Sequence, residues 1–470
     1  MKFDFSQLPL NDRAFSEKPM TFCDADPKRV LSGIIDLITI ETGRRKAREN
    51  WQKAQLRNLL KHVHERSPFW RKRIGTKKIS DLKLSDLPIL TRRDVVGQVE
   101  SEGSLLHQSD GHFVDTHATS GSSGTPVKFF ISEMNGNYNR VRSLAQFFME
   151  GRDLSLNRTR FRRFDDAKEA KSDIKNGFIV DVTNSWIGPL GGLFKSGINK
   201  HIDLSKQHME DWHRKRDLLI EELSRDSIGY LVLAPSLLRA VFHDDNMEFF
   251  SKYKTEMLIP LSEEISEDLR GLFCMQNIPV RGNYSSEEVG VIGCECQHYP
   301  SNYHVANSNV IVEIDKNSTV TIGASTLSRV LLTHLHSYAT PFIRYDVGDL
   351  VALADCCKCG HDGPVISNVV GRTKNLVKHA DGRLTPFLHL REGDMIRCAK
   401  VDEFRVRQTT VNDIVLELSG CGTLTEDQHI YFTELIKKHA GVDFNVDIRI
   451  VAEIDWGLSV KRPAFRNELI

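Results

Sequence analysis

Beyond residue 127 the sequence alternates between strand-like and helix-like segments, and this alternation restricts the fold more than any other feature. Short apolar runs typical of strands lie at 129–131, 178–182 and 230–233, and helical periodicity covers 135–150 and 209–223. Such alternation is typical of an α/β core, in which loops at strand ends carry the chemistry. We therefore predict a large α/β domain.

The first 110 residues have the pattern of a helical lead-in to this domain. The predicted buried faces are Leu31, Ile34, Ile35 and Ile38 in one helix, and Leu56, Leu59, Leu60 and Val63 in the next. The dipeptide Ser67-Pro68 predicts the end of the second helix.

The last hundred residues have a smaller α+β pattern of their own. Strand-like runs lie at 404–406, 414–418 and 446–451. The helical face predicted between them consists of Phe432, Leu435, Ile436 and His439. A chain of 470 residues exceeds one compact core, and the composition changes near Gly371. We predict an N-terminal domain over 1–371 and a second domain over 372–470.

The charge balance argues against two classes of partner. Lys plus Arg total 63 and Asp plus Glu total 63, so nothing in the overall charge favours nucleic acid or a membrane surface. No apolar run approaches the length of a membrane span, and the start Met1-Lys2-Phe3-Asp4-Phe5 carries acid where a signal peptide is basic and then apolar. We expect a cytoplasmic protein.

The stretch Thr119–Pro126 contains three serines and two glycines, which allow backbone N–H groups and hydroxyls to surround an anion. It predicts a phosphate-binding loop. A Walker-type loop has Gly-Lys-Ser/Thr at this point, whereas this chain has Gly124-Thr125-Pro126, so an ordinary P-loop NTPase is not expected. The alternative is a Ser/Gly surface loop without a ligand.

Two further segments each place a carboxylate beside other polar groups. In Asn283–Gly290, the ring of Tyr284 is suited to stacking on a base, and an acid four residues later is suited to holding Mg²⁺. In Pro341–Leu350, Asp349 follows a glycine at a predicted strand end, where a carboxylate is suited to accepting two hydrogen bonds from a ribose diol. A surface turn is the alternative for each.

Taken together, five separated features follow one order along the chain. They are the Ser/Gly loop, Tyr284 with Glu288, Gly348-Asp349, Gly371-Arg372-x-Lys374, and Lys461 near the end. This order resembles the adenylate-forming superfamily of acyl/aryl-CoA synthetases and adenylation domains. The segments Ser67-Pro68-Phe69-Trp70 and Leu87-Pro88-Ile89-Leu90-Thr91 are similar to its phenylacetate–CoA ligase-like, capsule-biosynthesis-protein-like branch.

The resemblance implies an α/β adenylation domain followed by a small, mobile α+β lid, and it implies a role for each motif residue. The Ser/Gly loop would hold the β- and γ-phosphates of ATP through Ser120, Gly121, Ser122, Ser123, Gly124 and Thr125. Tyr284, with Ser285 beside it, would stack on adenine, Asp349 would take the ribose hydroxyls, and Arg372 would contact phosphate or ribose. Glu288 would bind Mg²⁺, Lys374 would be the hinge, and Lys461 would bridge the substrate carboxylate and the α-phosphate.

Three residues depart from the pattern of the superfamily. Ser285 stands where glycine is usual, Glu287 replaces a small hydroxyl residue, and Val460 replaces the glycine before the lysine. Glu287 and Glu288 therefore both remain candidates for the Mg²⁺ ligand.

The activity implied is ATP-dependent activation of a carboxylic acid to an acyl-adenylate, with release of pyrophosphate. The acyl group would then pass to the thiol of CoA or to the phosphopantetheine of an acyl or peptidyl carrier protein. Alternatives are an amine or hydroxyl acceptor, and a nucleotide-binding scaffold that has lost catalysis. The branch implies an aryl or small acyl acid, and a homodimer is compatible with it. The identity of the acid and the biosynthetic or degradative role stay open.

The nine cysteines are an odd number, and five of them lie in two tight clusters, which in a reducing compartment indicates metal binding rather than disulfides. Together with the resemblance, they suggest a closed tetrahedral Zn²⁺ site formed by Cys296, His304, Cys357 and Cys359, which would be structural. Further ligand candidates are Cys294, His298, Cys356 and His361. Buried cysteines without a metal are the alternative.

Overall fold

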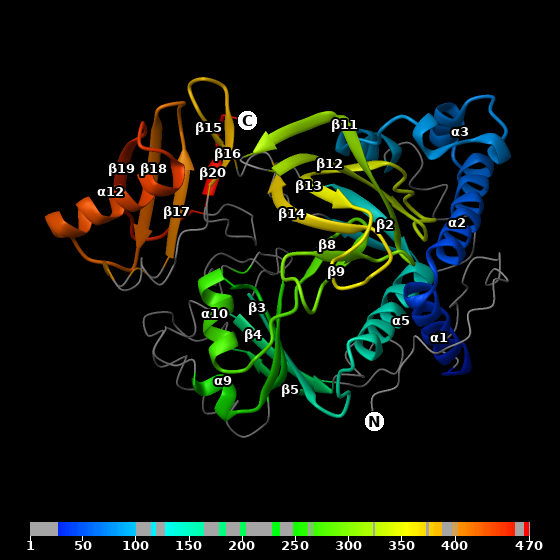
Figure 1. Cartoon of the computed structure of the whole chain (residues 1–470), viewed down its shortest axis with the longest axis horizontal. Coiled ribbons are helices and arrows are strands. Elements are labelled where there is room, and N and C mark those ends of the chain that lie inside the picture. The colour runs from blue at the N-terminus through cyan, green and yellow to red at the C-terminus, as the bar shows by residue number, and fades with distance from the viewer. Residues whose placement is uncertain are drawn as a thin grey trace.

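The protein folds into two sheet layers with a helical lead-in and a separate C-terminal unit (Figure 1). The computed structural model describes residues 27–99, 114–118, 127–163, 178–184, 198–203, 228–235, 248–261, 265, 267–322, 325–372, 376–387, 398–399, 401, 403–455 and 465–469. The helical segment predicted at 209–223 lies outside these ranges.

The lead-in consists of helices connected by short turns. They are α1 (Pro27–Thr42), α2 (Arg45–Arg66) and α3 (Pro68–Ile74), followed by the 3₁₀ turns η2 (Ile79–Asp81) and η3 (Leu84–Asp86). The predicted end of the second helix is confirmed, because α2 ends at Arg66 and the Ser67 side chain accepts a hydrogen bond from the Trp70 N–H at 3.0 Å. Pro68 occupies the first turn of α3, where its missing N–H costs no hydrogen bond.

The predicted buried face of α1 is partly wrong. Ile34, Leu37 and Ile38 are buried, whereas Leu31 and Ile35 are exposed. The buried residues pack against α5 (Glu133–Met149), and α5 covers only one side of α1. The apolar periodicity of α1 alone did not show which of its two overlapping faces would be covered by α5.

The first sheet has five strands in the order β5-β4-β3-β6-β7. Their bounds are β3 (Asn157–Arg163), β4 (Phe178–Asn184), β5 (Ile198–Asp203), β6 (Gly229–Leu233) and β7 (Thr255–Pro260). β3, β6 and β7 run parallel, and β4 and β5 join antiparallel. One apolar core lies between this sheet and the helices α9 (Glu248–Lys252) and α10 (Glu267–Met275).

The second sheet has seven strands in the order β11-β12-β13-β14-β10-β9-β8, all paired antiparallel. They are β8 (Asn283–Ser286), β9 (Gly290–Glu295), β10 (Tyr303–Val305), β11 (Val310–Ile322), β12 (Ser325–His334), β13 (Tyr345–Ala354) and β14 (Val365–Arg372). Its core includes Leu59, Leu60 and Val63 of α2, so the predicted inner face of that helix is confirmed for these residues. A hairpin of β1 (Val114–Ala118) and β2 (Lys128–Ser132) precedes α5.

The C-terminal unit has a core of its own. A short hairpin of β15 (Leu376–Lys378) and β16 (Leu384–Pro386) precedes a sheet in the order β19-β18-β17-β20, formed by β17 (Glu403–Gln408), β18 (Asp413–Ser419), β19 (Asn445–Ile450) and β20 (Phe465–Asn467). Helix α12 (Glu426–Ala440) buries Phe432, Leu435 and Ile436 against this sheet, as the sequence predicts. The α/β fold with a smaller α+β unit is thereby confirmed.

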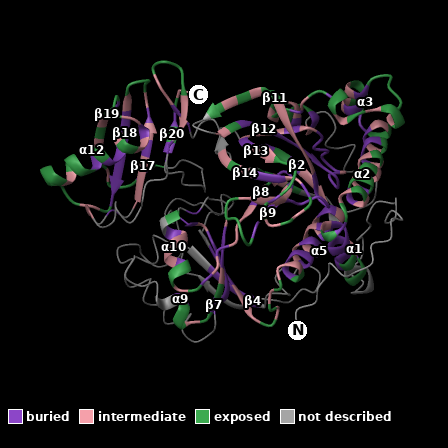
Figure 2. Cartoon of the chain, in the orientation of Figure 1, coloured by how far each residue is buried: buried purple, intermediate pink, exposed green. Residues whose placement is uncertain are grey.

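Buried residues follow many of the described strands, and exposed residues lie on helices such as α2, α3, α10 and α12 and on the connecting loops (Figure 2). None of the helices in the described ranges is both long enough and apolar enough to span a bilayer.

Candidate active site

The segment Asn283–Gly290 forms strand β8 and the turn into β9. Alternation along β8 buries Tyr284 and exposes Ser285. In the turn, Glu288 is buried and its neighbour Glu287 is exposed. The structure therefore distinguishes the two glutamates by burial, which the sequence did not do.

The segment Pro341–Leu350 contributes strand β13. Asp349 lies inside this strand and not at its end, because β13 continues to Ala354 along β14. The expectation of a strand-end aspartate is thus wrong, although the polar role is unaffected. Gly348 has a φ of 88°, a conformation that glycine adopts without steric cost, and its N–H donates to Asp346 Oδ1 at 2.8 Å. This local turn of the backbone precedes Asp349.

The two segments are joined by reciprocal hydrogen bonds between tyrosines and carboxylates. The Tyr284 hydroxyl donates to Asp349 Oδ2 at 2.7 Å, across 65 residues of sequence. The Tyr345 hydroxyl donates to Glu288 Oε1 at 3.0 Å, across 57 residues. Each segment thus supplies one tyrosine and, four residues later, one carboxylate that accepts a bond from the other segment. The structure brings three predicted site residues, Tyr284, Glu288 and Asp349, to one place.

Arg372 is the last residue of β14, and its backbone pairs with that of Asp349. The predicted positions Ser120, Gly121, Ser122, Ser123, Gly124, Thr125, Lys374 and Lys461 lie outside the described residues. The strands on either side of the Ser/Gly stretch are described, and Ala118 pairs with Lys128 in the β1–β2 hairpin. This hairpin reaches the seven-stranded layer, since the Phe130 N–H donates to Thr340 Oγ1 at 2.9 Å.

Helix α5 supports the first segment with polar side chains that the sequence analysis did not single out. Gln146 Nε2 donates to Asn283 Oδ1 at 3.0 Å and to Glu150 Oε1 at 2.7 Å. Arg142 is buried one turn earlier and lies 3.8 Å from Cys294 Sγ, where burial raises the pKa of that thiol to about 11. Arg142 and Gln146 are four residues apart and so share one face of α5, but the helix carries many other polar residues, so the sequence alone did not identify this face.

Asn309 holds the other side of the turn that contains Glu288. Its Nδ2 group donates to the Val289 carbonyl at 2.9 Å and to the Val291 carbonyl at 2.7 Å. A buried amide that bridges two carbonyls fixes the entry into β9. No sequence pattern pointed to this residue, because its partners lie 20 and 18 residues away in the chain.

A second polar cluster lies at the opposite end of β9. The ligand atoms of Cys296, His304, Cys357 and Cys359 all lie within 4.8 Å of one another. Cys357 Sγ is 3.8 Å from Cys296 Sγ, and Cys359 Sγ is 3.4 Å from His304 Nε2. The four residues are the ones that the sequence analysis grouped: Cys296 directly follows β9, His304 lies in β10, and Cys357 and Cys359 lie in the loop between β13 and β14.

The pKa shifts within this cluster differ from one residue to the next. Burial lowers the pKa of His304, which keeps its imidazole neutral. Burial would raise the pKa of the Cys296 thiol, but hydrogen bonds from the backbone N–H groups of His298 and Tyr299 bring that pKa below its ordinary value. The pKa of Cys359 is instead raised to about 11, by burial and by the neighbouring Cys357 and Cys296. A neutral imidazole and a deprotonated thiol are the forms that bind a soft cation, so His304 and Cys296 are the two members whose pKa shifts favour binding.

The further ligand candidates lie outside the cluster. Cys294 contacts Arg142, and Cys356 and His298 are exposed. The ring of His361 stacks on that of His304 with centroids 4.1 Å apart and an angle of 8° between the planes.

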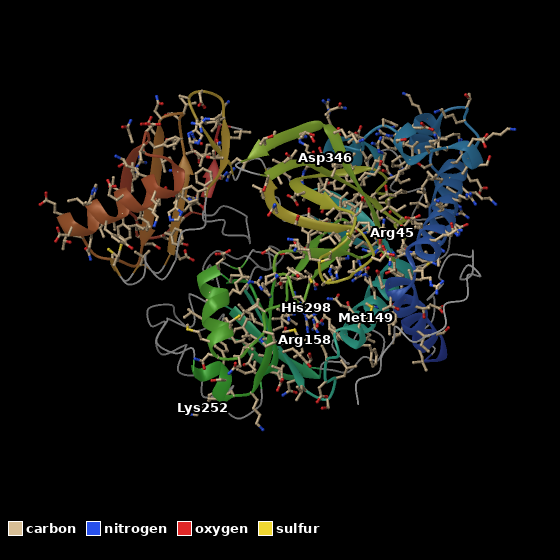
Figure 3. The ribbon with its side chains drawn as sticks, in the orientation of Figure 1. Arg45, Met149, Arg158, Lys252, His298 and Asp346 are labelled. Atoms are coloured by element: carbon tan, nitrogen blue, oxygen red, sulfur yellow. The ribbon has the colours of Figure 1, made fainter. Side chains whose placement is uncertain are left out.

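The cluster is attached to the lead-in through the start of α2. Arg45, which is labelled in Figure 3, donates from Nε to Asp362 Oδ1 at 2.9 Å and from NH2 to the Asp355 carbonyl at 2.6 Å. Buried Arg48 donates to the Gly43 carbonyl at 3.0 Å and to the Asp362 carbonyl. The loop that carries Cys357 and Cys359 is therefore held at both of its ends.

No family model matches the sequence, and no curated protein matches it. The structure is similar to that of 2-hydroxyisobutyryl-CoA ligase in the postadenylation state in complex with 2-HIB-AMP, with a TM-score of 0.62 and 15% identity over 92% of each chain. A second structure of that ligase, in complex with R3-HIB-AMP, gives a TM-score of 0.59 and 15% identity over 100% of this chain and 96% of the other. GH3.15 acyl acid amido synthetase gives 0.51 and 14% over 90% and 88%. The chain therefore shares the fold of these enzymes.

Proposed function

We propose that this chain is an adenylate-forming ligase. It would join a carboxylic acid to the AMP half of ATP, release pyrophosphate, and pass the acyl group to a thiol of CoA or of carrier-protein phosphopantetheine. The observation that carries the proposal is the contact between Tyr284 and Asp349, 2.7 Å apart across 65 residues, in a chain that shares its fold with a ligase whose structure contains 2-HIB-AMP.

The geometry fits a nucleoside held between the two segments. The resemblance assigns adenine to Tyr284 and the ribose diol to Asp349, and the contact between these side chains supports a single nucleoside site. A carboxylate offers about four lone-pair positions, so Asp349 can accept from a ribose diol while it keeps a bond from Tyr284. The backbone of Arg372 pairs with that of Asp349, which places the two residues on neighbouring strands at this site.

Glu288 is the proposed ligand of Mg²⁺, supported by its burial and by its bond from Tyr345, whereas Glu287 is exposed. When bound, Mg²⁺ would neutralise phosphate charge as the carboxylate attacks the α-phosphorus. Two anions meet in this step, so groups that offset their repulsion lower the barrier by roughly several kcal/mol where water is excluded.

The remaining roles follow from the resemblance and are part of the proposal. Ser120–Thr125 would bind the β- and γ-phosphates through N–H and hydroxyl groups, and Lys461 would bridge the acyl and α-phosphate oxygens. Lys374 would be the hinge of the C-terminal unit. Withdrawal of Lys461 after adenylation would let a thiol approach the adenylate.

The proposed domain boundary at 371/372 is supported by the separate core of the C-terminal unit. Its apolar cluster contains residues from Val377 to Phe465, and the β15–β16 hairpin belongs to it. Asn467 Nδ2 donates to the Leu376 carbonyl at 2.7 Å, and Gln408 Oε1 accepts from the Lys378 N–H at 2.9 Å. The hairpin also packs on the seven-stranded sheet, because Leu376 and Leu384 share an apolar cluster with Leu327 and Leu350. A unit with a core of its own is nevertheless the kind of unit that can move relative to its neighbour.

We also propose a structural Zn²⁺ site at Cys296, His304, Cys357 and Cys359. Three thiols and one imidazole within 4.8 Å are a donor set that zinc prefers, and four protein ligands fill a tetrahedral shell. With no open position, zinc would connect β9, β10 and the β13–β14 loop, and would not take part in catalysis.

The finer features of the proposal rest on the resemblance to the phenylacetate–CoA ligase-like branch. They are an aryl or small acyl acid as substrate, CoA or a carrier protein as acceptor, a cytoplasmic location and compatibility with a homodimer. The length of the apolar part of the acid and the nature of the acceptor are the two variables that an activity screen resolves.

The proposal is tested by measuring pyrophosphate release with ATP and Mg²⁺ over aryl, amino and short aliphatic acids, with and without CoA. We expect release with at least one acid, and its loss in Lys461→Ala because the charge that bridges the reacting anions is removed. Tight ATP binding without turnover of any acid would favour the scaffold alternative. Unchanged release in Lys461→Ala would refute the role of that lysine.

A further inference from the structure

Tyr345 has no part in the nucleotide site as proposed, yet its hydroxyl contacts a residue of that site directly. It donates to Glu288 Oε1 at 3.0 Å, and both side chains are buried. Within the described ranges, the other carboxylate oxygen of Glu288, Oε2, accepts no hydrogen bond. One oxygen is thus fixed and the other is left for a further partner.

The ring of Tyr345 is held rigidly by its surroundings. It is 2% exposed and packs edge to face against Phe342, with ring centroids 5.2 Å apart. The main chain on both sides of it pairs with the lead-in, since the Leu90 N–H donates to the Arg344 carbonyl at 2.9 Å and the Asp346 N–H donates to the Leu90 carbonyl at 3.0 Å. Two ladder bonds around one residue leave its hydroxyl little freedom to move.

Arg344 adds a second attachment to the same lead-in segment. Its φ of 53° is disfavoured for a residue with a side chain, so the surroundings must hold it there. Its guanidinium donates to the Leu87 carbonyl and forms an ion pair with Glu313 at 3.2 Å. The segment Leu87–Thr91 has no role in the proposed function. These contacts show that it fixes the backbone that carries Tyr345.

We infer that Tyr345 is a positioning residue that orients the Glu288 carboxylate toward the metal ion bound with ATP, and that the Leu87–Leu90 segment of the lead-in holds Tyr345 in place. A hydrogen bond to the non-ligating oxygen of a carboxylate restricts its rotation and selects the oxygen that faces the cation. The inference rests on the proposed function, because it requires Glu288 to be the ligand.

A matched pair of substitutions separates this role from simple packing. Tyr345→Phe removes only the hydroxyl that contacts Glu288. Tyr338→Phe is the control, because the Tyr338 hydroxyl is also buried but has no hydrogen-bond partner within the described residues. Both changes keep the ring, so both variants should fold with melting temperatures close to that of the unmodified chain.

The measurement is calorimetric ATP binding by the full chain, at a series of Mg²⁺ concentrations and in EDTA. For Tyr345→Phe we expect the Mg²⁺ concentration at half-maximal binding to rise about 10-fold or more, as for other partners of metal ligands, with ATP affinity in EDTA unchanged. Tyr338→Phe should leave both quantities as they are. A structural effect would instead weaken ATP binding equally with and without Mg²⁺.

A double-mutant cycle completes the test. In a Glu288→Gln background, Tyr345→Phe should have no further effect on the Mg²⁺ dependence, because the carboxylate it orients is absent. An unchanged Mg²⁺ dependence in Tyr345→Phe, or an equal effect in the Glu288→Gln background, would overturn the positioning role while the proposed function stands. If the unmodified chain binds no Mg²⁺–ATP, the proposed function fails first, and the inference fails with it.

Discussion

The two ends of strand β9 present opposite kinds of ligand chemistry. Before its first residue lies Glu288, a carboxylate with one oxygen bonded to Tyr345. Directly after its last residue lies Cys296, one of four sulfur and nitrogen donors that face one another. Hard oxygen ligands with free positions suit Mg²⁺, which usually keeps waters and phosphate in its shell, whereas thiolates and imidazole suit Zn²⁺.

The interactions that hold the residues in place also differ between the two ends of β9. At the carboxylate end, hydrogen bonds from Tyr345 and Tyr284 orient Glu288 and Asp349, and Oε2 of Glu288 accepts no hydrogen bond from the residues that the structure describes. At the sulfur end, the four ligand atoms already surround one point, and Arg45 and Arg48 hold the loop from behind. In the proposed function, one end would bind a cation that arrives with substrate and the other a cation that stays.

The largest effect should come from the carboxylate end. We expect Glu288→Gln to lower pyrophosphate release by about 100-fold or more, since a cation that offsets the charge of the transition state contributes several kcal/mol. The melting temperature should change little, because the amide keeps an oxygen that accepts from Tyr345. Steady-state pyrophosphate assays alongside thermal melts would measure both.

Glu287→Gln is the matched control, since this neighbouring acid is exposed. Its activity should stay within about 2-fold of the unmodified chain, as surface changes away from the site usually have small effects. If Glu287→Gln were the more damaging of the two, the assignment of the ligand would be reversed.

The sulfur end should show the reverse pattern, with stability affected more than chemistry. We expect protein purified without chelator to contain zinc, and Cys357→Ala to lower the melting temperature by at least about 5 °C, because a structural metal contributes folding free energy. Metal analysis and thermal melts would measure this. Cys356→Ala, at the exposed neighbouring thiol, should retain the metal and the melting temperature. Zinc-free native protein of full stability would contradict the structural site.

Residue type and spacing, together with the resemblance, grouped the side chains that the structure brings together at both ends of β9, although the sequence left Glu287 and Glu288 as alternatives. The spacing of Tyr284 and Glu288 and the Cys-x-Cys pattern at Cys357 depend on local sequence, and the structure places these residues in their expected groups. The α/β alternation was equally local, and the strands observed at 128–132, 178–184 and 229–233 extend the predicted runs by only one or two residues at an end.

What the sequence did not predict depends on the register between distant strands. The bond from Tyr345 to Glu288 spans 57 residues, and no local pattern pairs the two segments. The position of Asp349 inside β13 depends on how far β14 extends alongside it. The exposed face of α1 likewise depends on where α5 lies. Each miss concerns tertiary packing, which single-sequence periodicity does not encode.

The smallest effect expected is at the link between α2 and the sulfur end. The ion pair of Arg45 with Asp362 is solvent-exposed, with side-chain exposures of 39% and 63%. An exposed pair of this kind contributes about 0.5 kcal/mol, so Arg45→Gln should shift the melting temperature by no more than about 2 °C. Its second bond, to the Asp355 carbonyl, restrains the loop that carries Cys357 and Cys359.

Loss of this restraint should appear in the rate at which zinc leaves. We expect a chromogenic chelator to remove zinc from Arg45→Gln a few-fold faster than from the unmodified chain, because the loop opens more often when one attachment is missing. Arg44→Gln, at the exposed residue before α2, serves as the control and should release zinc at the original rate. Equal rates in all three proteins would show that the bonds of Arg45 add nothing to the retention of zinc at this end of β9.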